Sequence, residues 1–204
     1  GKTEQPPPRM LLSRRYWLYY VLTFFEGARK QVLGTFGTLV LVQYFGWEVW
    51  KTSTLLFVTS VATLICSPYL GALVDRFGVR RALVSAYILL VACCVAFAIV
   101  RQPIVLAALV GVIKLALVLN MGLSIYVNQI APPEQLLPTL SAGVSINHIS
   151  SVAAPLIAGA LMPLIGYSGV FLMTGGLVAL SIPFAAMLNA RQRAVAQAEP
   201  ALAS

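Results

Sequence analysis

The feature that most constrains this chain is a series of six long apolar runs, separated by short segments with charged residues, glycine or proline. A helix needs about 20 mostly apolar residues to cross roughly 30 Å of hydrocarbon, and each run is long enough. Strands of a membrane barrel would instead appear as runs of about ten alternating residues. We therefore predict an all-helical polytopic membrane protein with six transmembrane helices. They span residues 16–45, 51–73, 82–100, 103–127, 137–165 and 170–188.

The composition excludes a water-soluble domain. Hydrophobic residues make up 59% of the 204 residues, charged residues only 10%, and the mean hydropathy is +0.88. Soluble domains have roughly 25% charged residues. The net charge of +8 would suit nucleic acid only if the basic residues formed a patch on a soluble surface. They lie instead between apolar runs, so we expect a lipid bilayer as partner and no nucleic acid.

The distribution of lysine and arginine predicts the orientation, because cytoplasmic loops near the membrane are enriched in both. If both termini are cytoplasmic, nine basic residues lie on the inside and only Lys51 and Arg101 on the outside. We therefore expect both termini in the cytoplasm. The nine residues are Lys2, Arg9, Arg14, Arg15, Arg76, Arg80, Arg81, Arg191 and Arg193.

One connection, between the second and third runs, contains a motif: residues 71–83 read GALVDRFGVRRAL. Gly71 would let two helices approach closely, and Gly78 would permit a tight turn. Asp75 could pair at the membrane surface with nearby bases. These bases are Arg76, Arg80 and Arg81.

This block resembles the signature loop between the second and third helices of the major facilitator superfamily, although Val79 stands where a basic residue is common. Residues 153–159, AAPLIAG, are similar to the small-residue and proline pattern in the fifth or eleventh helix of that family. The resemblance covers about residues 16–188. It implies six helices built as two three-helix inverted repeats. The matched loop positions are Gly71, Leu73, Asp75, Arg76, Gly78, Arg80 and Leu83.

Six spans are half of the usual twelve in that family. Residues 1–15, which contain three prolines and an arginine pair at the end, resemble the last part of the central cytoplasmic loop. We therefore expect a C-terminal half, with a six-span bundle over residues 16–188 and a cytoplasmic tail over residues 189–204. The expected partner is a second six-span half, in the same polypeptide, in a separate chain or in a homodimer. A natural half-sized protein is the alternative.

Three predicted spans carry a titratable group at similar depth. Glu26 lies ten residues into the first span, and Lys114 and His148 lie eleven residues into the fourth and fifth. At 1.5 Å per residue these groups are roughly 15 Å deep, near the bilayer centre. A charge there costs at least about 2.5 kcal/mol, so such residues are candidates for function.

The charged groups also have structural interpretations. Glu26 can pair along its own helix with Arg29 and Lys30, which lie three and four positions later. Lys114 has no charged neighbour at helical spacing, so it faces a cavity, a carbonyl or an acid on another helix. A structural pair between Lys114 and Glu26 is the competing interpretation.

Polar residues also lie within the later spans. Asn147, His148 and Ser151 are close together on the fifth span, and Asn120 lies in the fourth. Such residues could line a water-filled route for a solute or a proton. Hydrogen bonding between helices is the alternative.

These features predict half of a secondary active transporter that moves a small solute through the cytoplasmic membrane of a bacterium by alternating access. The embedded bases Arg29, Lys30 and Lys114 outnumber the embedded acid Glu26, which favours an anionic solute. We expect proton coupling, slightly better served by His148 than by Glu26. A scaffold or assembly factor that keeps the fold without transporting is the alternative.

Enzyme function is not expected. The cysteines lie inside apolar runs, and the single histidine excludes a bis-histidine haem. We therefore expect no cofactor and no metal. The signature loop, with Asp75 at its centre, is expected to serve the conformational cycle rather than recognition of the solute.

Overall fold

The computed structural model describes residues 12–188, and every regular element in this range is a helix. The all-helical class is therefore confirmed. The predicted tail (189–204), most of the predicted leader (1–15) and the basic residues Lys2, Arg9, Arg191 and Arg193 lie outside the described residues. The helices are α1 (Trp17–Gln43), α2 (Val49–Phe77), α3 (Val79–Ile99), α4 (Pro103–Val118), α5 (Gly122–Ile130) and α6 (Pro133–Ala186), with the 3-10 turns η1 (Arg14–Tyr16) and η2 (Leu119–Met121).

Four stretches within residues 12–188 are long and apolar enough to cross a membrane by length and composition alone. They are α2, α3, the stretch Pro103–Ile130 and α6. The 27-residue α1 is not among them because it carries Glu26, Arg29 and Lys30. The 54 residues of α6 would extend about 80 Å as one straight helix, far more than a bilayer core. The arrangement is compatible with six passes.

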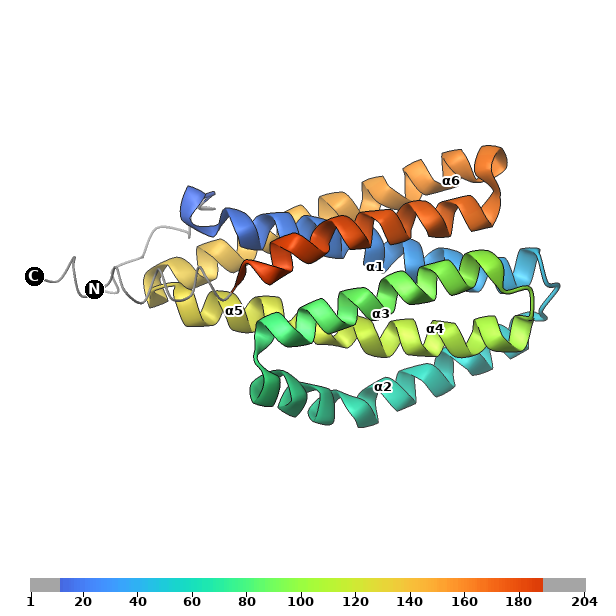
Figure 1. The fold of residues 1–204 in the computed structure, drawn as a ribbon, viewed down its shortest axis with the longest axis horizontal. Helices are drawn as coiled ribbons and strands as arrows, with labels where there is room; N and C mark the ends of the chain where they lie inside the picture. Colours follow the sequence, from blue (N-terminus) through green and yellow to red (C-terminus); the bar gives the residue numbers. More distant parts are fainter. Residues whose placement is uncertain (1–11, 189–204) are drawn as a thin grey trace, which may run out of the picture.

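Two glycines reverse the chain where the sequence predicts turns. Gly78 alone separates α2 from α3, with a φ of 83°. Gly166 has a φ of 65° and divides α6 into two arms, which fold back on each other in Figure 1. Other residues rarely adopt this region of backbone space, so glycine makes both turns possible. The predicted fifth and sixth spans are these two arms of α6, and the predicted four-residue connection is a single non-helical residue.

The fourth pass differs from its prediction. Residues 103–127 read as one uninterrupted run, but the 3-10 turn η2 divides the pass into α4 and α5. Gly122 follows the turn, and a Cβ atom there would lie 3.2 Å from Val79 on α3. Gly71 on α2 faces η2, since a Cβ atom there would lie 3.9 Å from Met121 Sδ. The missing side chain of Gly122 therefore allows α3 to lie close to this interruption, and α2 is in ordinary contact with it at Gly71.

The core lies where α1 packs against both arms of α6 and against α4, and where α3 packs against α6 and α4. Apolar side chains fill these contacts. Phe97 of α3 and Phe171 of α6 stack with ring centroids 4.3 Å apart. By contrast, α2 lies at the side of the bundle and leaves much of its apolar surface exposed (Figure 1). Many large apolar side chains of these passes are thus exposed on the outer surface, as expected for helices in lipid.

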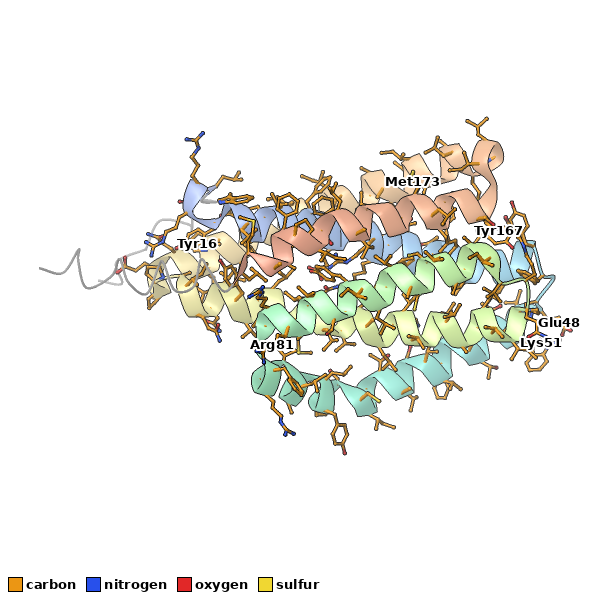
Figure 2. All side chains as sticks on the ribbon, in the orientation of Figure 1. Tyr16, Glu48, Lys51, Arg81, Tyr167 and Met173 are labelled. Carbon is orange, nitrogen blue, oxygen red and sulfur yellow. The ribbon has the colours of Figure 1, made fainter. Side chains whose placement is uncertain are left out.

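The two ends of the bundle are held by different polar contacts. Figure 2 shows Tyr16 and Arg81 toward one end and Lys51 and Tyr167 at the other. At the first end the Tyr16 hydroxyl donates to the Gln135 amide oxygen at 2.9 Å, which links η1, directly before α1, to the start of α6. At the second end Arg101 donates a hydrogen bond to the Tyr167 hydroxyl, next to the turn of α6.

Candidate functional site

Arg29 is the most deeply buried charged residue of the described chain, with 0% of its surface exposed. One terminal nitrogen donates to Asn120 Oδ1 at 2.7 Å, and the other donates to Ser181 Oγ at 3.2 Å. The guanidinium group lies over the ring of Tyr87, 3.9 Å from its centroid. Arg29 on α1 therefore contacts η2, the second arm of α6 and α3 at once.

This arginine is held without a carboxylate in contact. Within residues 12–188 the single ion pair closer than 4.0 Å joins Lys51 and Glu48, in and beside the connection from α1 to α2. Arg29 Nε has no hydrogen-bond partner. A buried charge is expensive in a membrane unless hydrogen bonds and dipoles stabilise it, so the Asn120, Ser181 and Tyr87 contacts are each important.

A second group of basic residues lines an open cavity of about 500 Å³ between α1, α2 and α4. Lys30 and Lys114 both face it, together with polar side chains of α1 and α2. The described residues that line it include no acid. The full lining is Lys30, Gln31, Gly34, Ser60, Thr63, Lys114, Leu117 and Val118.

Glu26 does not form the ion pairs expected from the sequence. It is half-buried on α1 and interacts electrostatically with Arg29 and Lys30, but neither base lies within 4.0 Å of it in the described chain. The pair with Lys114 is likewise not formed. The reason is geometric. The side chain of Arg29 points toward the interior of the bundle and that of Lys30 toward the cavity, so neither base approaches the carboxylate of Glu26.

The polar residues of the fifth pass serve contacts between helices. Ser151 Oγ donates to the carbonyl oxygen of Gly27 at 3.2 Å, and Asn147 Nδ2 approaches that of Thr23 at 3.5 Å. These are the contacts expected of the helix-packing alternative. His148 is exposed on the surface of α6 and is not among the residues that line the lysine cavity.

The signature loop lies at the end of the bundle where Arg81 is labelled in Figure 2. The expected ion pair of Asp75 with the nearby arginines is not formed within residues 12–188. Arg76 instead lies 5.7 Å from the ring centroid of Phe77. The charged side chains of this loop are all exposed, so they are available to groups outside this bundle. They are Asp75, Arg76, Arg80 and Arg81.

Sequence reasoning missed Tyr87 and Ser181, the two other contacts of Arg29. Each is a polar residue inside a long apolar run, which was the available signal. Their relation to Arg29 could not be read from the chain, because Ser181 is 152 residues away from it.

Comparison with known proteins identifies a family of membrane proteins, in agreement with the long apolar helices of the structure. A search of curated proteins gives no match to this chain. The sequence model described as Major Facilitator Superfamily matches residues 19–203, which is most of the chain and all of its passes from α1 onward. The chain therefore belongs to the major facilitator superfamily, a family of membrane transporters and not of enzymes.

Proposed function

We propose that this chain is one half of a secondary active transporter for a small anionic solute. The observation that carries the proposal is the cavity lined by Lys30 and Lys114 without an acid among its described lining residues. Two ammonium groups that share one cavity create a positive field, and an anion placed between them lowers their mutual repulsion. About 500 Å³ is within the usual size of a small-molecule site.

The hydrogen bonds around the cavity decide which groups can donate to a solute. The hydroxyl groups of Ser60 and Thr63 donate to carbonyl oxygens of their own helix, each at 2.7 Å. Their hydrogens are thus directed away from a solute. The donors that remain for it are the two lysine ammonium groups and the amide of Gln31.

A complete transport path requires a second half. The cavity is open on one side, and the six passes described here do not close it. We propose that a second six-helix unit does so, in the same polypeptide or in another chain, and that this chain is the C-terminal half. We place it in the cytoplasmic membrane of a bacterium, with both termini inside, because the basic residues favour that side nine to two.

For proton coupling we propose Glu26 and keep His148 as the second candidate. Glu26 lies one helical turn before Lys30 on α1 and interacts with both neighbouring bases. His148 is exposed on α6, and neither it nor Glu26 is among the described residues that line the lysine cavity. A carboxyl group that gains or loses a proton here would change the charge next to the cavity directly.

The experiment that tests the solute class is a thermal-shift titration of the purified chain with phosphate, acetate, succinate and choline. We expect an anion of this panel to raise the melting temperature of the wild type, and Lys114→Ala to lose the effect. Lys114→Arg should retain part of it, because the charge is kept. Stabilisation by choline alone, or an unchanged anion response in both variants, overturns the proposal and leaves the scaffold alternative.

A further inference from the structure

The two lysines of the cavity lie on the same two segments of the chain as the buried residues Arg29 and Asn120. Arg29 and Lys30 are consecutive on α1, and Arg29 turns inward where Lys30 faces the cavity. Asn120, which accepts the 2.7 Å hydrogen bond from Arg29, follows Lys114 by six residues in the same pass. The buried hydrogen bond from Arg29 to Asn120 therefore joins the two segments whose lysines, Lys30 and Lys114, face the cavity.

The shape of the guanidinium group suits this connection. Its two terminal nitrogens donate to η2 and to the second arm of α6, and its face rests on Tyr87 of α3. A planar group with several fixed donors holds three elements in one arrangement, which the single flexible ammonium of lysine cannot do.

The element that Arg29 contacts is the interruption of the fourth pass. A 3-10 turn has 3.0 residues per turn and rises about 2.0 Å per residue, against 3.6 residues and about 1.5 Å in an α-helix. If the three residues of η2 became α-helical, α4 would rotate relative to α5 by about 60° and shift by about 1.5 Å. Lys114, in the last turns of α4, would move with it.

We propose that Arg29 is a positioning residue of the transport cavity. Through Asn120 it holds η2 against α1, while Ser181 of α6 holds the guanidinium group in place. This fixes Lys114 of α4 at the rotation where it shares one cavity with Lys30 of α1. The inference rests on the proposed function of that cavity, but the geometry of the two segments can be measured without any solute.

The test is a spin-label distance across the cavity, between cysteines at Gly34 and Leu117, which both line it. The background is the full chain with Cys66→Ala, Cys93→Ala and Cys94→Ala. We expect a narrow distribution for this protein. With Asn120→Leu added, the acceptor of Arg29 is lost, and the distribution should broaden or shift by several ångströms as η2 relaxes.

Matched variants separate positioning from general damage. Asn120→Asp keeps the acceptor oxygen and replaces Nδ2, which has no partner in the described structure, by a second oxygen that can accept from Arg29 as a carboxylate, so it should retain the narrow distribution. Ser181→Ala should broaden it, whereas Ser85→Ala should not, because Ser85 donates only to the carbonyl oxygen of Ala82 on its own helix. If Asn120→Leu does not fold, Arg29→Lys gives the same test with the charge kept.

The anion titration gives the second measurement. Loss of the hydrogen bond from Arg29 to Asn120 should weaken anion binding by about tenfold, which is the effect of one hydrogen bond to a charged group. An unchanged distance distribution in Asn120→Leu and Arg29→Lys overturns the positioning role. A changed distribution in a protein whose wild type binds no anion of the panel supports the positioning role and rejects the solute class instead.

Discussion

The close contact between α1 and α6 at Gly27 gives the sharpest prediction for stability. A methyl group at this position would overlap Ser150 Oγ and the carbonyl oxygen of Asn147, and would lie 3.0 Å from that carbonyl's carbon. The obstacle is backbone, so Gly27→Ala must separate the two helices. Overpacking of this kind costs about 1–3 kcal/mol. The separation also weakens two hydrogen bonds, from Ser151 to Gly27 and from Asn147 to Thr23.

Hydrogen bonds between membrane helices average about 0.6 kcal/mol each, so the expected loss of unfolding free energy is about 2–4 kcal/mol in total. The measurement is unfolding by SDS in mixed micelles, followed by tryptophan fluorescence. Gly34→Ala is the control, since nothing lies within 4 Å of a Cβ atom there. It should be neutral or slightly stabilising. Equal midpoints for Gly27→Ala and Gly34→Ala would show that the helices are not in backbone contact.

Four further predictions follow from single positions. Gly166→Ala should cost about 1–3 kcal/mol in the same titration, because its φ of 65° and ψ of 176° lie in a region essentially restricted to glycine, whereas Gly176→Ala, which has open space, should not. Asp75→Asn should slow turnover and leave solute affinity unchanged in uptake kinetics; lost affinity with normal turnover would contradict this. Single cysteines in the leader and at Arg101 should react with an impermeant reagent from opposite sides of the membrane. Hydrogen bonds from nearby lysine and tryptophan side chains hold the pKa of Glu48 below its usual range, so its small stabilising effect is present at neutral pH and disappears as the pH falls through that lowered pKa. Glu48→Gln should remove this pH dependence from the melting temperature.

The sequence predicted those parts of the fold that depend on local pattern. The apolar runs located the passes to within a few residues, and Gly78 marked its turn, because hydropathy and backbone freedom are properties of a short segment. The interruption at η2 was missed because residues 119–121 are as apolar as their surroundings apart from Asn120. A turn of this kind depends on contacts from other helices, which a local pattern does not contain.

In the candidate site, too, the sequence predicted what depends on local pattern and missed what depends on the packing of the helices. Sequence placed Arg29, Lys30 and Lys114 in the passes, since a charge inside an apolar run is visible without a structure. It could not assign them to different environments, because that depends on the rotation of each helix about its axis. Arg29 and Lys30 are adjacent in the sequence, yet the first is fully buried and the second is exposed to the cavity.

The single-residue turns at Gly78 and Gly166 have a consequence for how the length of this chain can change. A turn of one residue has no further loop residues that could absorb a change in length. An inserted residue must therefore either lengthen the turn or enter a helix, where it rotates every following side chain by about 100°. The connection from α1 to α2, residues 44–48, is the longest within residues 12–188. Natural insertions and deletions among relatives should therefore concentrate at residues 44–48, and an epitope tag should be tolerated there and at neither glycine.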